Sequence, residues 1–364
     1  ARATYFADGP PAAGDIFRNP DLASTYRLIA RKGRDAFYKG EVADAVDAYM
    51  KRIGGDLRKE DFAAHKSEWI DPACVDYRGY DLCELPPNSQ GFAALQMANI
   101  LKHVDIAQWP RGGPEVLHYI TEAKRLAFED VARYYADPAF ADIPVEALLS
   151  EDYAKKRLAL INPDKAMTQP APGENLLEGE GDTTYLTVAD KDRMMVSLIQ
   201  SNYRGMGSGL VPDGLGFMLQ DRGELFSMEV GHANQYAPGK RPFHTIIPAF
   251  VMKDGAPLMS FGLMGGGMQP QGHVQVLINI VDYGMNLQEA GDAARLNHVG
   301  GRSPTVSDGD LLGVLNVEPG ISEATIGRLR AMGHNVRIVE DGAMFGGYQA
   351  IRRAGIDAGF RVAP

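Results

Sequence analysis

The sequence predicts a layered α+β fold, and three observations support this prediction. Helical patterns dominate the first half of the chain, strand patterns begin abruptly at Thr183, and helical patterns return after Gln271. Apolar residues make up 45% of the 364 residues and charged residues 23%, which is typical of a globular chain with a substantial core. Strands followed by helices that pack on them favour a layered α+β or sandwich architecture.

The helices of the first half are predicted from apolar residues that recur at helical spacing. The longest begins with a proline at a helix start, Pro114, and extends to Tyr135. Further helices are predicted over residues 19–32, 41–53, 91–103 and 145–160. Between them, residues 74–87 alternate well enough for short strands that end at Pro86 and Pro87.

The second half opens with a predicted β-hairpin. The stretches TTYLTVA and MMVSLIQS are joined by the polar turn Asp190 to Arg193. Pairing outward from that turn places Thr183 opposite Gln200 or Ser201, so that a second hydroxyl would lie close to the first. Further strands are predicted over residues 216–219, 246–252 and 258–262, and further helices over residues 271–283, 287–295 and 323–332.

Thr183 comes after a connector rich in glutamate and glycine, residues 171–181, and two interpretations are open for it. In the first interpretation, Thr183 starts an ordinary strand, because threonine is a good strand residue. Alternatively, cleavage of the bond between Asp182 and Thr183 creates an N-terminal nucleophile whose own α-amine serves as the base. No GxSxG motif competes with Thr183 as nucleophile, and neither cysteine sits beside a suitably placed histidine.

Two glycine-rich stretches lie in different sequence contexts. The stretch GMGSG at residues 205–209 precedes a turn and a predicted strand, which disfavours a nucleotide-binding loop. The triplet Gly265 to Gly267 lies between a predicted strand and a predicted helix. Its backbone N–H groups suit an oxyanion or a carboxylate, and a plain loop that needs positive φ is the equal alternative.

Charge and composition point to small-molecule partners. The net charge of −10 and the isoelectric point near 5.3 argue against a nucleic-acid or anionic-membrane surface. The eight histidines are scattered, so we expect no metal and no other cofactor. Cys74 and Cys83 are interpreted as small apolar residues in a reducing compartment, with one disulfide as the alternative. We therefore favour a cytoplasmic location, and the start ARATYFADGP without a methionine leaves a preceding signal peptide open.

Eight stretches in the same order and spacing resemble the γ-glutamyltransferase family of N-terminal-nucleophile hydrolases. They are FYKG, YRGY, PPNSQG, DTTYLTVADKD, GMGSG, GKRP, GGG and DYGMN, which span Phe37 to Asn286. The resemblance implies a four-layer αββα sandwich formed by one precursor that cleaves itself before Thr183. Residues 1–182 would then belong to a large subunit, residues 183–364 would form a small one, and the two would make one intertwined domain. We expect the N-terminal portion of the large subunit to be absent from this sequence.

The resemblance also assigns site residues. The nucleophile corresponds to Thr183, its supporting hydroxyl to Ser201, and the oxyanion-hole glycines to Gly265 and Gly266. Three positions that hold a γ-glutamyl amine in the family, as Asn, Gln and Asp, correspond here to Tyr203, Arg222 and Leu225. The paired serines that hold the α-carboxylate correspond to His244 and Thr245. The predicted site thus gains a cation and keeps its donors, which suits a small anionic acyl group without an amine.

This profile is similar to the non-glutamyl branch of the family, which includes oxamate amidohydrolases and cephalosporin acylase-like proteins. We therefore expect an autoprocessed amidohydrolase that acts on a small anionic amide through a Thr183 acyl-enzyme. A homo-oligomer of the two-subunit protein is the further assembly that we consider. A glutathione hydrolase or γ-glutamyltransferase is the first alternative, and a catalytically inactive binding module is the second. The alternative for Arg222 itself is an exposed surface salt bridge.

Overall fold

The computed structural model describes residues 1–7, 9–170, 181–305, 310–354 and 360–363. The chain divides into two compact units. The helical unit consists of Ala1–Ile70 and Arg204–Asp221, and the sheet unit consists of Asp71–Tyr203 and Arg222–Pro364. All predicted site residues fall in the sheet unit.

The helical unit is held together by a small apolar cluster. Buried Val42, Val46 and Met50 lie on one face of α4 at helical spacing and pack with Leu215 from the second segment. Asn19 caps α2 by accepting a hydrogen bond from the Leu22 amide at 2.9 Å. The helices of this unit are α1 (Arg2–Tyr5), α2 (Pro20–Lys32), α3 (Arg34–Tyr38), α4 (Glu41–Ile53) and α5 (Lys59–Ala64).

The strand predicted over residues 216–219 is wrong. Gly216 has φ +73° and lies against the start of α2, where an added Cβ would be 2.2 Å from the Leu22 amide nitrogen. Its carbonyl accepts hydrogen bonds from the Tyr5 hydroxyl at 2.9 Å and from Asn19 Nδ2 at 2.7 Å. These contacts anchor the segment as a loop instead of a strand.

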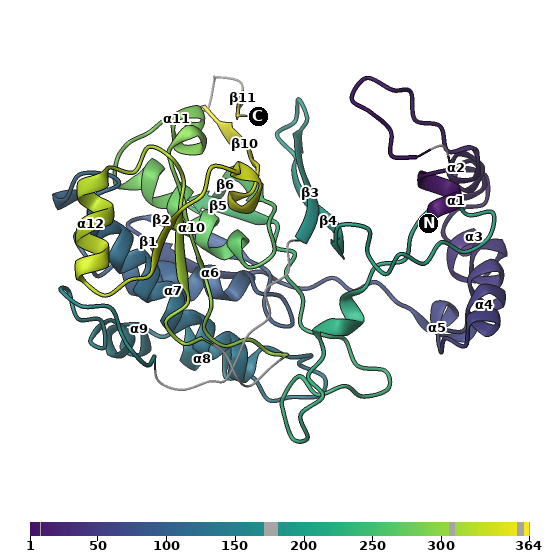
Figure 1. Ribbon diagram of the computed structural model, residues 1–364, viewed down its shortest axis with the longest axis horizontal. Helices are drawn as coiled ribbons and strands as arrows, with labels where there is room; N and C mark the ends of the chain where they lie inside the picture. Colours follow the sequence, from purple (N-terminus) through teal and green to yellow (C-terminus); the bar gives the residue numbers. More distant parts are fainter. Residues whose placement is uncertain (8, 171–180, 306–309, 355–359, 364) are drawn as a thin grey trace. The chain divides into compact units, whose positions relative to one another are not determined.

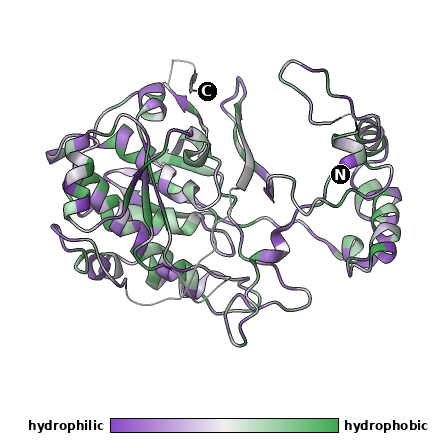
Figure 2. Cartoon of the chain, in the orientation of Figure 1, coloured by the Kyte–Doolittle hydropathy of each residue, from purple (hydrophilic) through white to green (hydrophobic). Residues whose placement is uncertain are grey.

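The sheet unit is built on a six-stranded sheet with the order β1-β2-β5-β6-β10-β11, and every neighbouring pair in it is antiparallel. Hydrophobic stretches run along its central strands and the helices beside them (Figure 2). The strands are β1 (Ala73–Tyr77), β2 (Tyr80–Glu84), β5 (Ala249–Lys253), β6 (Ala256–Leu263), β10 (Tyr348–Arg353) and β11 (Phe360–Ala363).

Opposite faces of this sheet carry different layers (Figure 1). On β6, the Phe261 ring packs against His273 of α10 (Met268–Val281) with ring centroids 4.8 Å apart. The next residue, Gly262, faces Tyr185 of β3 (Gly181–Ala189), which forms a hairpin with β4 (Met195–Arg204). Because successive residues of a strand point to opposite faces, α10 and the β3–β4 hairpin cover opposite faces of the sheet. The structure therefore shows a helix layer, a sheet and a hairpin layer.

The remaining elements of the sheet unit surround this arrangement. Their bounds are β3 (Gly181–Ala189), β4 (Met195–Arg204), α6 (Gly91–Leu101), η1 (Ile106–Gln108), α7 (Pro114–Tyr134), α8 (Val145–Leu148), α9 (Glu151–Leu158), η2 (Arg222–Leu225), α11 (Leu287–Asp292), β7 (Leu296–Val299), β8 (Val314–Val317), α12 (Glu323–Ala331), β9 (Val336–Ile338) and η3 (Gly342–Phe345). The helix predicted over residues 145–160 is thus split, because Ser150 caps α9 by accepting a hydrogen bond from the Tyr153 amide.

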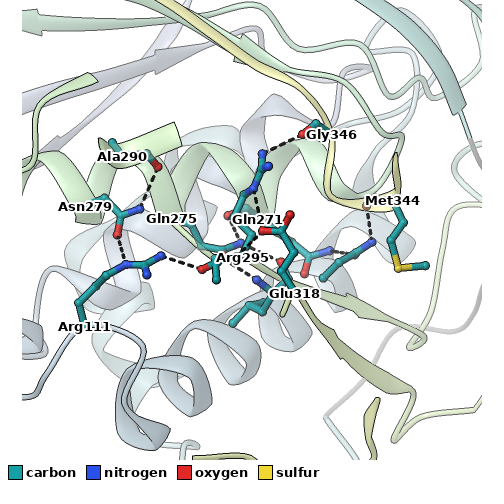
Figure 3. A network of polar contacts seen from close by, with 12 residues as sticks. Arg111, Gln271, Gln275, Asn279, Ala290, Arg295, Glu318, Met344 and Gly346 are labelled. Atoms are coloured by element: carbon teal, nitrogen blue, oxygen red, sulfur yellow. Dashed lines mark hydrogen bonds and ion pairs between the residues drawn. The ribbon is translucent and has the colours of Figure 1, made fainter. Parts of the chain in front are cut away.

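A buried polar network ties α10 to the second sheet, β7-β8-β9 (Figure 3). Gln275 donates from Nε2 to the Leu296 carbonyl at 3.0 Å and accepts from the Leu296 amide at 2.9 Å. Gln271 bridges in the same way to His298, because its Nε2 donates to the His298 carbonyl at 3.2 Å and its Oε1 accepts from the His298 amide at 2.8 Å. Both glutamines thereby complete the backbone hydrogen bonding of β7, which fixes α10 against that strand.

The interpretation of Cys74 and Cys83 as free apolar residues is wrong, because the structure joins them in a disulfide. They are directly paired in the β1–β2 register. Disulfides persist in oxidising compartments, so this bond removes the basis on which a cytoplasmic location was favoured. None of the helices in the described part of the chain has the length and apolarity that crossing a bilayer requires.

Candidate functional site

Thr183 is buried, with 4% of its surface exposed, near the start of β3. The hairpin turn fixes its neighbour across the strand pair, since the Asp190 amide donates to the Met194 carbonyl at 3.0 Å. Continued without a bulge, that pairing sets Thr183 opposite Ser201, one of the two residues predicted from the sequence. The backbone of Asp182 lies in β3 as well, whereas the connector before it, residues 171–180, lies outside the described residues.

The packing of β3 on β6 leads from Thr183 to the glycine triplet. The Thr187 and Ser260 hydroxyls are hydrogen-bonded. Two residues closer to the start of β3 and two residues closer to the end of β6, an added Cβ at Gly262 would lie 2.5 Å from the Tyr185 ring. Extended by another two residues, the same alignment would set Thr183 near Met264, directly before Gly265. The same face of β3 therefore carries Thr183 toward the loop that joins β6 to α10.

Gly265 and Gly266 adopt backbone conformations that favour glycine, with φ +114° and +55°. Among the described residues, their amide N–H groups have no hydrogen-bond acceptor. The loop leads directly into α10, whose N-terminal dipole favours negative charge at this position. Both interpretations of the triplet thus hold together: it is a loop with positive φ, and its donors suit an oxyanion.

Tyr203 connects the Ser201 hydroxyl to a buried cation. Its φ of 80° is rare for a bulky residue, and its amide donates to Ser201 Oγ at 2.7 Å. The guanidinium of Arg222 lies over the Tyr203 ring at 5.5 Å from the centroid. Backbone strain of this kind persists where the surroundings over-determine it, as at binding sites.

Arg222 is buried, with 8% exposed, so the alternative of an exposed surface salt bridge is wrong. Its Nη1 donates to Thr245 Oγ1 at 3.3 Å. Burial, followed by the charges of Arg222 and Arg241, lowers the pKa of neighbouring His244 to about 4. His244 is therefore neutral near pH 7, and its buried Nδ1 has no partner among the described residues. Arg222 supplies positive charge here, while Thr245 and His244 supply neutral polar groups.

Two positioning contacts were not foreseen from the sequence. Asn234, fully buried, donates to the Leu225 carbonyl at 2.6 Å and accepts from the Phe243 amide at 2.9 Å. It thereby connects the η2 turn that carries Arg222 to the segment before His244. Gln90 binds the carbonyls of Thr245 and Gly266. The stretch PPNSQG was a signal for Gln90, whereas Asn234 stands in a loop without a recognisable motif.

The structure gathers His118, Glu122 and His334 closely enough to consider a metal ion. Each contact, however, is satisfied within the protein. His118 bonds His334 Nε2 and the Asn162 carbonyl, both at 2.8 Å, and Glu122 accepts from Arg125 and from the Met167 amide. We interpret this cluster as a structural hydrogen-bond network between α7 and the chain after α12.

Comparison with known proteins places this geometry in context. The sequence matches the family described as gamma-glutamyltranspeptidase over residues 1–361. It is 39% identical over 331 residues to the glutathione hydrolase-like YwrD proenzyme of Bacillus subtilis, with 91% of this chain and 61% of that protein covered. It is 33% identical over 333 residues to the oxamate amidohydrolase proenzyme of Klebsiella pneumoniae, with 91% and 60% covered.

Among solved structures, cephalosporin acylase from Bacillus halodurans superposes with a TM-score of 0.87 at 38% identity, covering 99% of this chain and 65% of the other. This chain therefore shares the fold of that part of the acylase and spans about three fifths of the length of the curated relatives. The profile match over residues 1–361 and the shared acylase fold show that the chain belongs to the gamma-glutamyltranspeptidase family.

Proposed function

We propose that this protein is an autoprocessed amidohydrolase that cleaves the amide of a small anionic substrate of the oxamate type. The observation that carries the proposal is the buried Arg222, held between the Tyr203 ring and the Thr245 hydroxyl. A buried guanidinium in the position where relatives would hold an amine matches a carboxylate and repels an ammonium. The names of the Klebsiella oxamate amidohydrolase and the Bacillus acylase among its relatives support the same class of reaction.

In the proposed reaction, cleavage of the bond between Asp182 and Thr183 frees the Thr183 amine. That amine removes the proton of the Thr183 hydroxyl while Oγ1 attacks the substrate amide carbonyl. The Gly265 and Gly266 N–H groups stabilise the resulting oxyanion. The C–N bond then breaks, the amine leaves with the transferred proton, and an ester to Thr183 remains. Water hydrolyses that ester, which releases the carboxylic acid and restores the threonine.

Each remaining group has a role in this proposal. Ser201 supports the nucleophile from the opposing strand, and Arg222 with Thr245 holds the substrate carboxylate. Neutral His244 contributes a hydrogen bond without adding charge. The mature protein would consist of a large subunit that ends at Asp182 and a small subunit that begins at Thr183, in a four-layer sandwich. The substrate is a small molecule, and the proposed chemistry requires no cofactor.

A glutathione hydrolase is the second candidate, favoured by the 39% identity to the YwrD protein named as glutathione hydrolase-like. Arg222 separates the two candidates, because the α-ammonium of a γ-glutamyl group would lie beside a buried guanidinium. Like charges in a water-poor site repel strongly. The amidohydrolase proposal is therefore the better supported by the site.

The test compares ammonia release from oxamate with γ-glutamyl release from glutathione. We expect turnover of oxamate and little of glutathione. Arg222→Ala should lower kcat/KM for oxamate by roughly 10- to 100-fold, since a hydrogen bond to a charged group contributes about 1.5–3 kcal/mol. Arg241→Ala is the matched control, because Arg241 also acts on His244 electrostatically but is exposed.

Equal losses of kcat/KM for oxamate in the two arginine variants would show that overall positive charge near the site, and not direct contact with Arg222, assists turnover. Efficient glutathione hydrolysis with no turnover of oxamate would overturn the proposal in favour of the second candidate.

A further inference from the structure

Gln90 joins the two halves of the proposed site. It directly precedes α6 and is buried, with 1% of its surface exposed. Its Nε2 donates to the Thr245 carbonyl at 2.7 Å and to the Gly266 carbonyl at 2.7 Å. Its backbone amide donates to the His244 carbonyl at 3.0 Å. One side chain thus contacts the backbone of both the substrate-binding pair and the oxyanion loop.

The residues before Gln90 hold only one of these two segments. The Asn88 carbonyl accepts from the His244 amide at 3.0 Å, and Asn88 Nδ2 donates to the Pro242 carbonyl at 2.6 Å. Ser89 Oγ donates to the Ile246 carbonyl at 3.3 Å. The stretch 88–90 therefore runs closely along residues 242–246. Among the described contacts of these three residues, only those of the Gln90 side chain also include the glycine loop.

The chemistry of the position requires a glutamine. A neutral primary amide offers two N–H donors on one nitrogen, which matches two buried carbonyls. A glutamate in its place would set a carboxylate against both carbonyls, and an asparagine would be one methylene too short to reach both. Removal of the amide would leave the Thr245 carbonyl without this buried donor, at a cost of about 1–3 kcal/mol.

The Gly266 carbonyl is the more sensitive of the two partners. It also accepts from the Gln269 amide at 3.2 Å, so Gln90 and the first turn of α10 hold it together. The peptide group between Gly265 and Gly266 carries the Gly266 N–H, which is one of the proposed oxyanion donors. Because glycine at φ +55° has no side chain to restrict it, fixing its carbonyl restricts the direction of its N–H.

We infer that Gln90 is a positioning residue that couples the substrate-binding segment 242–246 to the oxyanion loop 264–268. This inference rests on the proposed function: the carboxylate end of the substrate would bind at Thr245, and its carbonyl oxygen would bind at Gly265 and Gly266. The distance between these two points must match one small molecule. Displacements of about 1 Å at such a site cost on the order of 100-fold in rate, so a fixed link between them is mechanistically valuable.

The test replaces Gln90 by methionine, which preserves volume and removes both donors. Gln275→Met is the matched control. Gln275 is also buried, and its Nε2 also donates to two carbonyls, those of Gln271 and Leu296, both at 3.0 Å. Neither of these partners belongs to the proposed site. We expect both variants to lose thermal stability to a similar degree.

Two readouts separate positioning from a general structural role. In hydrogen-exchange mass spectrometry, Gln90→Met should accelerate exchange in both segments, 242–246 and 264–268, whereas Gln275→Met should leave both near wild type. In oxamate kinetics, Gln90→Met should lower kcat by roughly 10- to 100-fold with a smaller change in KM, because misaligned oxyanion donors weaken the transition state first. Gln90→Asn should give an intermediate result and covers the case in which the methionine variant does not fold.

The inference is overturned if Gln90→Met and Gln275→Met give the same exchange pattern in both segments, or if exchange changes in 242–246 alone. A wild-type protein that hydrolyses neither oxamate nor glutathione would refute the proposed function. The exchange experiment does not depend on substrate, so it would still decide whether Gln90 couples the two segments.

Discussion

Tyr203 illustrates how much of the site is decided at the level of single residues. From sequence it was one of three substituted positions, and its φ of 80° could not be predicted, because tyrosine rarely adopts that conformation. The structure explains the conformation through its neighbours, with Ser201 Oγ accepting from its amide and Arg222 covering its ring. The burial of Arg222 was equally unpredictable, since it depends on residues some twenty positions away on both sides.

The residue pairs that the sequence predicts are those set by local rules. A tight turn fixes the register of a hairpin, so the proximity of Thr183 to residue 200 or 201 could be inferred from the spacing alone. The positive φ of Gly265 and Gly266 could be inferred from residue type, whereas Gly267 of the same triplet has φ −67°. The contacts of Gln90 and Asn234 join distant segments, so they could not be predicted locally, although the stretch PPNSQG pointed to the region of Gln90.

Buried histidines make the stability of this protein dependent on pH, and His334 allows the clearest test. Burial, followed by the charges of His118 and Arg125, lowers the pKa of His334 to about 3. The unfolded chain takes up a proton near the ordinary pKa of 6.5, whereas the folded chain does not. The resulting stability is complete above pH 6.5 and is lost as the pH falls from 6.5 toward 3.

We therefore expect His334→Gln to cost less stability at pH 5.0 than at pH 7.5, by roughly 1–2 kcal/mol. Urea unfolding curves of both proteins at the two pH values measure this difference. Exposed His65→Gln is the control and should show the same small effect at both. An equal cost of His334→Gln at the two pH values would contradict the assignment of a neutral buried imidazole.

At the scale of elements, the longer helices were predicted well, whereas the short helices α1, α3 and α5 and the later strands were not. Helix α4 coincides with its prediction, and α2 and α7 each differ by one residue at an end, because caps and prolines mark those boundaries in the sequence. The strands β7 to β11 were not predicted. Most are only three or four residues long, and such strands are defined by neighbours rather than by their own pattern.

The β1–β2 hairpin carries the disulfide, and this makes its contribution to stability measurable. The bond closes a short loop, with a sequence separation of 9. Restricting the unfolded chain in this way contributes about 2–3 kcal/mol in the chain-entropy account. We expect reduction to lower the urea midpoint of the wild-type protein by a corresponding amount.

The double variant Cys74→Ala with Cys83→Ala should unfold at the lower midpoint and be insensitive to the reductant. Mass spectrometry first confirms that reduction is complete. If the urea midpoint of the reduced wild-type protein is then unchanged, the hairpin needs no covalent link.

At the scale of the whole molecule, the hairpin layer has an unusual polarity. Its inner face carries Thr183, Tyr185 and Thr187 toward the six-stranded sheet, while apolar residues point outward. Leu186, Val188, Val196 and Leu198 are 40–51% exposed. Alternation along the strands separates the two faces, but it does not show which face lies against the sheet. The inward hydroxyls are the feature on which the proposed chemistry depends.

The proposed function requires that Thr183 becomes an N-terminal nucleophile, and denaturing intact-mass analysis decides whether it does. The wild-type protein, Thr183→Ala and the exposed neighbour variant Thr184→Ala are compared after purification. We predict two chains for the wild type and for Thr184→Ala, the smaller one beginning at residue 183, and a single folded, uncut and inactive chain for Thr183→Ala. A single chain in all three proteins, or cleavage that persists in Thr183→Ala, would show that Thr183 is not such a nucleophile.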